Sequence, residues 1–322
     1  MEDIINKQPL VTVGIICYNR TEGFKNTLKC ITGQTYKNLE IIISQDFHDT
    51  IDFTEVATSA GDNRVTFVKQ TKRLSMYNNF LFVLEKASGE YFMWAADDDW
   101  WAPDFIEKVM ELLIANPSAA LGFTDFMEVD EHNNRITTYP NHLPLLQEFA
   151  IADNVQRIKN YIGQFEAFGK PNLIYSIFRT KVLRSKQVIE LLNFGELPVD
   201  MLINLTVLLS GKLVVVPELL RTATLTVVKG YRQEVYTPHI INLLIIRVNI
   251  GAFKYLLKKW NNYLYYHFKI VGQSDLNAFE KLAINLSILK KILLFYYDVV
   301  CDCISLRGYN IFAKIRRQYR LN

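Results

Sequence analysis

The run YFMWAADDDWW, residues 91–101, contains the pattern on which the fold prediction depends. Its first part, Tyr91–Ala96, is apolar throughout, which is typical of a strand that is buried on both faces of a parallel sheet. Three aspartates, Asp97, Asp98 and Asp99, follow directly, and two tryptophans come after them. In open α/β sheets, ligands bind just beyond the carboxyl ends of the strands. We therefore predict a ligand site at the aspartates.

Around this run, strand and helix patterns alternate over the first 125 residues. Short apolar runs predict further strands at Val11–Cys17, Leu39–Ser44, Val65–Val68 and Ala120–Thr124. Helical patterns between the strands begin near Thr21, Ser75 and Pro103. This alternation predicts an α/β fold with a Rossmann-like, mostly parallel sheet that carries helices on both faces.

Beyond residue 125 the pattern is less regular. The expected elements are a helix at Glu148–Ile162, a strand at Leu173–Phe178, a helix at Asp200–Ser210 and a strand at Lys212–Val216 that ends at Pro217. After about residue 235 the sequence changes to long helical segments rich in Leu, Ile, Tyr, Phe and Lys. We therefore expect an α/β domain at 1–235 and a helical, basic region at 236–322.

The acidic triplet has the composition of a metal site. Three adjacent carboxylates repel one another, and a divalent cation such as Mg²⁺ or Mn²⁺ removes that repulsion. These hard cations take oxygen ligands and are often bound by one or two carboxylates together with substrate phosphates. A solvated acidic loop is the alternative explanation of such a triplet, but its position after a buried strand favours a binding site.

Charge is distributed unevenly along the chain. From His239 to the C-terminus there are 13 Lys and Arg residues against 4 Asp and Glu residues, a net charge of +9. Since the whole chain has a net charge of +3, the first 238 residues have −6. An acidic body with a basic C-terminal region indicates an anionic surface, such as a membrane, as a candidate partner, and it gives no indication of nucleic acid. The last cations are Lys314, Arg316, Arg317 and Arg320.

The C-terminal region has no stretch of about 18 uncharged apolar residues, the length needed to span a bilayer. Two explanations of this region stay open: a helical subdomain that packs on the rest of the chain or on a second subunit, or an amphipathic surface that rests on anionic lipid. The N-terminal sequence MEDIINKQPL has acidic residues where a signal peptide has positive charge. We expect a cytoplasmic location, with peripheral attachment to the cytoplasmic face of the membrane as a candidate.

Four segments together resemble glycosyltransferase family 2, the inverting enzymes with the GT-A fold. They are PLVTVGIICYNR at 9–20, QTYKNLEIIISQD at 34–46, SGEYFMWAADDDWWAPDFIE at 88–107 and LPVDMLINLTVLLSGKLVVVPELL at 197–220. The likeness extends from about Pro9 to Arg221. It implies that 1–235 is a GT-A catalytic domain, with a nucleotide-sugar half at about 1–125 and an acceptor half at about 126–235.

The resemblance implies a hexosyltransferase of polysaccharide biosynthesis. Such an enzyme moves a sugar from a nucleoside-diphosphate sugar, for which a UDP-sugar is expected, to a hydroxyl of a glycan or lipid-linked acceptor. Mg²⁺ or Mn²⁺ would assist at the family's DXD-type metal motif. The residues that match positions on the donor side are Thr12, Tyr18, Arg20, Asp46, Asn79 and Asp97.

The metal and catalytic positions depart in part from the family's pattern. Many relatives have Asp-x-Asp-Asp at the metal motif, and the first of those positions is Ala96 in this chain, which makes Asp98 and Asp99 the expected metal ligands. Asp200 matches the catalytic base, although an acidic residue often precedes it in the family and Val199 stands there in this chain. The histidine that the family often has after the next strand is missing from the stretch that begins at Arg221.

Two other functions compete with this interpretation. A sugar-phosphate nucleotidyltransferase also combines an α/β sheet with a metal-binding aspartate, but it would need a glycine-rich loop after the first strand, where this chain has only Gly23. A membrane-bound scaffold of weak or no activity that kept the fold is the second alternative, because the departures from the family's pattern fall at the metal motif, beside the catalytic base and at the missing histidine.

Overall fold

The computed structural model describes residues 8–130, 135–137, 142–164, 166, 169–194, 198–224 and 250–304. These residues form two compact units, each assembled from several stretches of the chain. The first unit takes its described residues from Met1–Phe126, Ile174–Gly195 and Leu213–Ala223. The second unit takes them from Met127–Leu173, Glu196–Lys212 and Thr224–Asn322.

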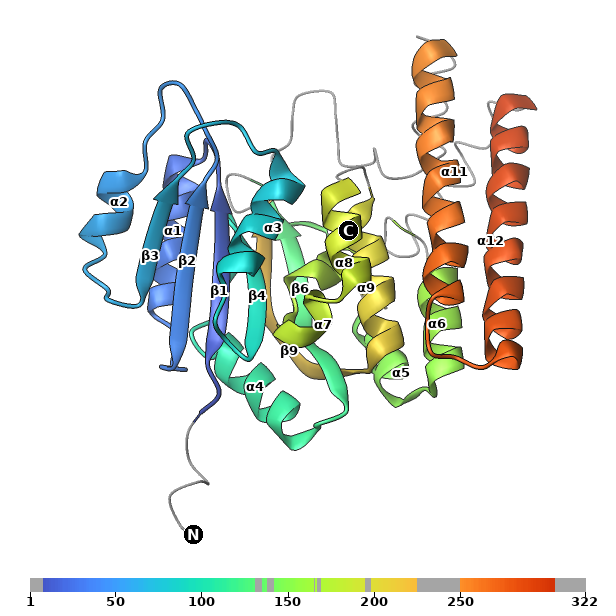
Figure 1. Ribbon diagram of the computed structural model, residues 1–322, viewed down its shortest axis with the longest axis horizontal. Coiled ribbons are helices and arrows are strands. Elements are labelled where there is room, and N and C mark those ends of the chain that lie inside the picture. Colours follow the sequence, from blue (N-terminus) through green and yellow to red (C-terminus); the bar gives the residue numbers. More distant parts are fainter. Residues whose placement is uncertain are drawn as a thin grey trace. The chain divides into compact units, whose positions relative to one another are not determined.

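Four parallel strands form one part of the sheet. They are β1 (Val11–Cys17), β2 (Leu39–Gln45), β3 (Val65–Lys69) and β4 (Tyr91–Ala96), in the order β3-β2-β1-β4. In this register Val11 lies opposite both Leu39 and Tyr91. The carboxyl ends of β1, β2 and β4 therefore lie at the same edge of the sheet (Figure 1).

The remaining strands make the sheet mixed. They are β5 (Trp100–Trp101), β6 (Ala119–Val129), β8 (Ile177–Arg179) and β9 (Lys212–Thr224), which continue the order as β4-β8-β6-β9-β5. Strand β8 is antiparallel to both of its neighbours, and β5 is antiparallel to β9. A short strand, β7 (Arg135–Thr137), pairs with the end of β6. The sheet is thus parallel from β3 to β4, and β8 is inserted between β4 and β6 in the antiparallel direction.

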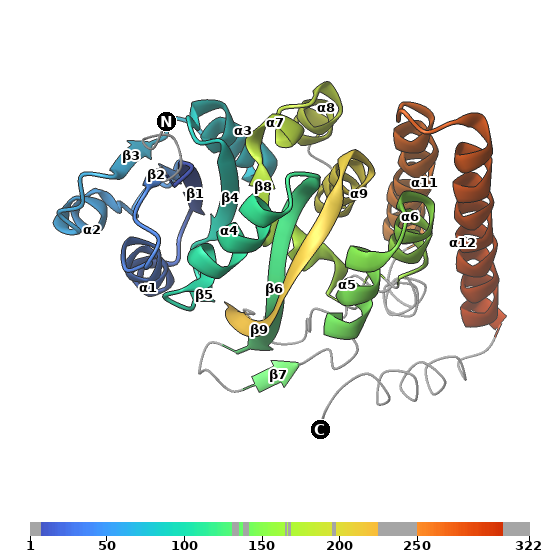
Figure 2. The same cartoon turned by 90° about the horizontal axis from the view of Figure 1, so that it is seen from below.

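Helices cover both faces of this sheet, as predicted. Helices α1 (Thr21–Thr32) and α4 (Phe105–Ala115) lie on one face, and α3 (Met76–Lys86) lies on the other beside α8 (Lys186–Phe194) (Figure 2). A Cβ on Gly14 of β1 would lie 2.7 Å from a methyl carbon of Val83, so the glycine allows α3 to pack closely. The short helices α2 (Thr54–Ser59) and α7 (Thr180–Leu183) complete the first unit.

The second unit is mostly helical. Its elements are α5 (His142–Ile151), α6 (Asn154–Gly163), most of the 3₁₀ helix η1 (Lys170–Tyr175), α9 (Val199–Ser210), α11 (Ile250–Gly272) and α12 (Ala278–Ile304). Helix α9 packs on α6 and α11, and α12 packs on α6 and α11 as the second arm of a hairpin (Figure 1). Of the helices in the described part of the chain, none combines the length and apolarity that crossing a bilayer requires. The cations from Lys314 to Arg320 lie outside the described residues.

Candidate active site

The acidic triplet follows β4 and is held in place by the first turns of α1. The hydroxyl of Thr27 lies 3.2 Å from the carbonyl oxygen of Ala96 and 2.9 Å from that of Asp99. A Cβ on Gly23 would lie 2.7 Å from the carbonyl oxygen of Asp97, so only glycine allows the loop to approach the helix this closely. The backbone of the triplet is therefore anchored at both ends, which fixes the positions from which its side chains extend.

Asp97 is bound to the end of β1. Its Oδ2 accepts a hydrogen bond from the backbone N–H of Tyr18 at 3.2 Å, and its Oδ1 lies 3.4 Å from Nη1 of Arg20. Burial raises the pKa of the Asp97 carboxyl, and the positive charge of Arg20 opposes that rise. Asp97 therefore connects β4 to β1 at the carboxyl edge of the sheet.

Asp98 has the least satisfied carboxylate of the three. Its side chain is 8% exposed, and Nη1 of Arg20 lies 2.6 Å from Oδ2 as an ion pair, yet this buried oxygen accepts no hydrogen bond. Burial and the neighbouring charge of Asp99 raise the pKa of Asp98 to about 7. A buried carboxylate oxygen without a hydrogen bond is costly, and a cation that approached it would offset that cost.

Asp99 is bound to Arg221 of β9 in a buried ion pair. Its Oδ2 accepts hydrogen bonds from Nε of Arg221 at 3.0 Å and from Nη2 at 2.5 Å. The guanidinium also lies 4.1 Å from the ring centroid of Tyr175, and β5, which begins directly after Asp99, pairs with β9, since Trp101 lies opposite Arg221. This contact fixes the far end of the triplet and gives Arg221 a role that the sequence did not reveal.

Three predicted donor-side residues lie at the ends of β1 and β2. The ring of Tyr18 lies 5.0 Å from that of His48 and has the Arg73 guanidinium over it at 5.0 Å. Asp46, which follows β2, accepts the N–H of Leu74 at 2.7 Å through Oδ1. Asn79 of α3 is buried. Its side-chain N–H donates to a backbone carbonyl oxygen near the end of β2, and its Oδ1 has no hydrogen-bond partner. These groups surround the carboxyl edge of β1 and β2.

Thr12 is placed apart from this group, at the other end of β1. Its side chain is fully buried. Its hydroxyl donates to the carboxylate of Glu40 and accepts the N–H of Gly89 at 2.9 Å. The structure thus gives Thr12 two hydrogen bonds within the sheet and does not bring it to the aspartates.

Asp200 lies in the first turn of α9 in the second unit. A carboxylate at this position is favoured by the positive end of the helix. Its Oδ1 accepts the N–H of Met201 at 2.8 Å. Burial raises the pKa of Asp200 to about 6, and hydrogen bonds from the backbone oppose that rise. A carboxylic acid with this pKa is ionised at neutral pH and still basic enough to take up a proton.

The second unit also contains a buried charge network centred on Glu166. Its Oε1 lies 2.6 Å from Nζ of Lys291 on α12 and 3.3 Å from Nζ of Lys170, and it accepts the hydroxyl of Tyr263 on α11 at 3.1 Å. Burial lowers the pKa of Lys170 to about 7, and the charge of Lys291 lowers it further in the same direction. One carboxylate therefore connects three segments of the second unit. No local pattern in the sequence indicates this network.

We expect Glu166→Gln to lower the free energy of unfolding by about 3 kcal/mol, because it leaves two lysines near one another without their carboxylate. Glu22→Gln is the matched control, since it removes a carboxylate from the exposed pair with Lys25 and should change stability by less than about 1 kcal/mol. Urea unfolding followed by circular dichroism measures both values. Equal losses in the two variants would contradict a stabilising role of the network.

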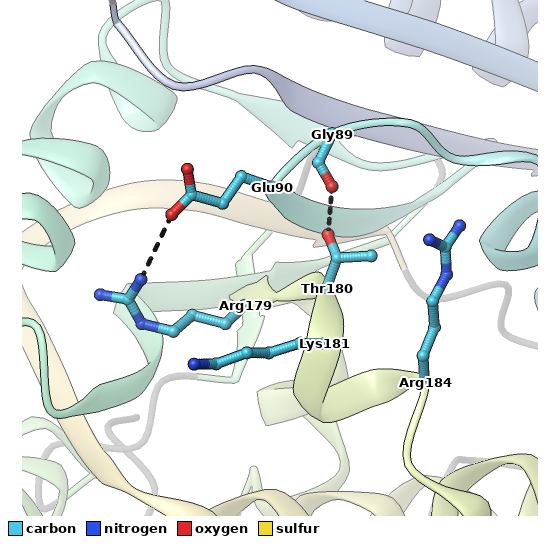
Figure 3. Close-up of a pocket in the computed structure, with 6 residues that line it drawn as sticks. All are labelled: Gly89, Glu90, Arg179, Thr180, Lys181 and Arg184. Atoms are coloured by element: carbon cyan, nitrogen blue, oxygen red, sulfur yellow. Dashed lines mark hydrogen bonds and ion pairs between the residues drawn. The ribbon is translucent and has the colours of Figure 1, made fainter. Parts of the chain in front are cut away.

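A basic pocket lies at the opposite edge of the sheet, beside the residues that precede β4. It has a volume of about 490 Å³ and is lined by Gly89, Glu90, Arg179, Thr180, Lys181 and Arg184 (Figure 3). Two of its cations stabilise the fold. Arg179 donates to backbone carbonyl oxygens near the end of α4 and at the start of β6, and Arg184 donates to a carbonyl oxygen near the end of α3. Since β4 separates this pocket from the aspartates, we assign it no part in the candidate site.

A family model for "Glycosyl transferase family 2" matches residues 12–177, which is more than half of the chain. The chain belongs to glycosyltransferase family 2. It has the GT-A fold that the sequence motifs implied. The match includes every donor-side and metal residue that the sequence predicted, whereas Asp200 lies beyond it.

The relatives of this family 2 chain agree with the assignment. An uncharacterized glycosyltransferase of Rickettsia typhi is 34% identical over 106 residues, which are 33% of this chain and 32% of that protein. The UDP-Glc:alpha-D-GlcNAc-diphosphoundecaprenol beta-1,3-glucosyltransferase WfaP of Escherichia coli is 30% identical over 104 residues, 32% of this chain and 41% of its own. The match thus spans only about a third of the length of the first relative.

Solved structures share the fold of this family 2 chain. The crystal structure of S. aureus TarS 1-349 in complex with UDP matches with a TM-score of 0.58 and 12% identity. The match covers 87% of this chain and 70% of the TarS chain. A complex of the same protein with UDP-GlcNAc has a TM-score of 0.56 and 13% identity. At this identity the likeness establishes the fold.

The donor set of the site is compatible with the divalent metal that the family implies. Among the residues that the structure describes, no three His, Cys, Asp or Glu side chains converge into a ready-made metal centre. Mg²⁺ and Mn²⁺ do not need one, since one or two carboxylates and substrate phosphates often suffice. The buried Oδ2 of Asp98, which accepts no hydrogen bond, is the group that fits such a cation.

Proposed function

We propose that the chain is an inverting glycosyltransferase that moves a sugar from a nucleoside-diphosphate sugar to a hydroxyl of a glycan or lipid-linked acceptor. The observation that carries the proposal is the acidic triplet at the carboxyl end of β4, in which only Asp98 keeps a buried oxygen without a hydrogen bond. The carboxylates of Asp97 and Asp99 already accept hydrogen bonds from Tyr18 and Arg221, respectively. We assign Asp98 as the metal ligand and Asp99 as the anchor that holds it in position.

The donor is expected to lie over the carboxyl ends of β1 and β2. Arg20 is 45% exposed, so its guanidinium can turn toward a diphosphate when a divalent cation takes its place beside the buried carboxylate of Asp98. Guanidinium groups bind phosphate oxygens in a bidentate way. We assign Tyr18 and Asp46 to the nucleoside and Asn79 to the polar wall of the donor site. A UDP-sugar is the expected donor, because the TarS complexes contain UDP and UDP-GlcNAc and WfaP is named for UDP-Glc.

The transfer requires a base that takes the proton of the acceptor hydroxyl and a positive charge that neutralises the leaving diphosphate. We assign Asp200 as the base that takes the proton of the attacking hydroxyl, a contribution of about 10²–10⁴-fold in rate. The oxygen of that hydroxyl forms the new bond to the anomeric carbon while the bond to the diphosphate breaks, which inverts the configuration. A divalent cation at Asp98, when bound, would neutralise the charge that develops on the departing diphosphate.

The acceptor is proposed to be part of a surface polysaccharide or its lipid-linked precursor. WfaP is named for an acceptor on diphosphoundecaprenol, and the B. subtilis relative TuaG is named for putative teichuronic acid biosynthesis. A lipid-linked acceptor would place the enzyme at the cytoplasmic face of a membrane. The cations between Lys314 and Arg320 supply a charge that would favour anionic headgroups.

A thermal-shift experiment with nucleoside diphosphates tests the donor site. We expect UDP with Mn²⁺ to raise the melting temperature by about 5 °C, because a ligand at about 100 times its Kd adds about 2.7 kcal/mol to the native state. Either component alone should have less than half of this effect. GDP, CDP and dTDP serve as the comparison set, and hydrolysis of the matching nucleotide sugar confirms turnover. If none of the four nucleotides shifts the transition with Mn²⁺ or Mg²⁺, the proposed function is wrong.

A further inference from the structure

Helix α12 exposes a continuous row of large apolar side chains. The row consists of Phe279, Leu282, Leu286, Leu289, Leu293 and Tyr296, which are between 39% and 85% exposed. Apolar residues scattered singly over a surface are ordinary, but a contiguous row of this size marks an interaction site. We call this row the α12 seam.

The opposite side of α12 is already occupied. Ile284 and Ile288 are fully buried, and Lys291 reaches Glu166 from the same side. That side packs on α6 and α11 (Figure 1). Helix α12 is thus apolar on two sides, and its own unit covers one of them. The seam is the other side, where Tyr296, at its end, bonds to α11 through Asn261. A partner would bind on the seam.

The spacing of the seam indicates what kind of partner fits. Its six members are separated by three, four, three, four and three residues. Alternating steps of three and four give a repeat of 3.5 residues, and a helix with this repeat buries the row against another helix in a left-handed supercoil. Because the seam has a regular repeat along most of α12, an identical helix related by two-fold symmetry presents the matching surface.

We propose that a second copy of this chain docks on the α12 seam, helix against helix. The positions that flank the seam, Ala283, Asn285, Lys290 and Ile292, carry a single charge, so two copies meet with little electrostatic repulsion. The helix has 27 residues and is about 40 Å long. Two seams of this length, each with several hundred Å² of apolar surface, reach roughly the 1,000 Å² of a specific interface.

A lipid surface fits the α12 seam less well. An interfacial helix keeps its opposite side polar and in contact with water, whereas the opposite side of α12 is apolar and packed. Cations attract such a helix to anionic lipid, but Lys290 is the single charge beside the seam and Glu280 lies near its start. Charge and packing together favour a second copy.

The test compares two neighbouring leucines in the full chain. Leu293 lies in the seam and is 71% exposed, whereas Leu294 lies outside it and is 53% exposed. We expect the unmodified chain to sediment as a concentration-dependent dimer. Leu293→Lys should raise the dimer dissociation constant by at least about 30-fold, since it places a charge in a desolvated interface. Leu294→Lys should change it by less than about threefold, and far-ultraviolet circular dichroism should be the same for all three proteins.

Three results would overturn the proposal. The first is a monomer at every concentration up to the solubility limit, as expected if another segment of the same chain covers the seam. The second is a dimer that both substitutions weaken equally. The third is a monomer that binds vesicles of phosphatidylglycerol and loses this binding in Leu293→Lys, which would make the seam a lipid contact.

Discussion

Replacement of Asp200 by asparagine is expected to lower the turnover number by about 10²–10⁴-fold and to leave donor affinity within about twofold of its original value. Asparagine keeps the shape of the side chain and can still accept the N–H of Met201, the contact that the structure gives this carboxylate. It cannot take a proton from the acceptor hydroxyl, which is the step that general-base catalysis accelerates. Transfer assays for turnover and titration of the nucleotide for affinity measure the two quantities separately.

The matched control is Asp153→Asn. Asp153 also lies at the start of a helix in the second unit, where its side chain accepts the N–H of Gln156. Since asparagine is an equally good residue at this position, stability and turnover should both stay nearly unchanged. Turnover of Asp200→Asn close to that of the unmodified enzyme would remove Asp200 from the mechanism.

The pH dependence of the unmodified enzyme provides an independent measurement for the same residue. Burial raises the pKa of Asp200 to about 6, so the basic form predominates above this pH and is lost below it. At saturating Mn²⁺, which would hold Asp98 in its ionised form, we therefore expect kcat/KM to fall about tenfold for each pH unit below about 6 and to level off above it. In Asp200→Asn this fall should be missing from the residual activity.

The strands with continuous apolar runs were predicted accurately. The bounds of Val11–Cys17 and Tyr91–Ala96 agree with β1 and β4, because such runs are buried on both faces and are apolar over nearly their whole length. Glu148–Ile162 was predicted as one helix, and the structure has two. The break falls where Asp153 starts a new helix, a local hydrogen bond that apolar periodicity does not reveal.

The predictions that failed involve segments whose conformation depends on distant partners. The first half of Leu173–Phe178, predicted as a strand, lies in a 3₁₀ helix, and the strand β8 begins only at Ile177. The strand predicted to end at Pro217 runs on to Thr224. Proline is tolerated there because β5 pairs with β9 only at Arg221 and Thr222, so no bond to β5 requires the missing N–H.

The acidic residues of the candidate site could be predicted from the sequence. The residues that hold them in position could not. Asp97, Asp98 and Asp99 stand after a recognisable strand, and the rule for α/β sheets places a ligand there. Arg221 is 122 residues away from Asp99, and no local pattern connects them. Gly23 was noted only as a glycine too isolated for a phosphate loop, yet it allows α1 to pack against the aspartates. Long-range pairs and close backbone contacts became visible only in the fold.

The three aspartates should respond differently to the same substitution. Asp98→Asn is expected to lower turnover by about 10²–10³-fold, a loss typical for removal of one group that stabilises charge in a transition state. Stability should change by less than about 1 kcal/mol, because the loss of the ion pair with Arg20 is offset by the removal of a buried negative charge that is repelled by Asp99. The increase in melting temperature that UDP gives with Mn²⁺ should disappear as well.

Asp99→Asn is the control that separates binding from folding. It leaves the buried guanidinium of Arg221 without its carboxylate, which should lower the free energy of unfolding by about 3–5 kcal/mol. Below its reduced melting temperature this variant should still respond to UDP with Mn²⁺, because Asp98 is intact. If Asp98→Asn keeps the Mn²⁺-dependent response and Asp99→Asn loses it at full stability, the metal binds at Asp99 and the assignment of the two aspartates must be exchanged.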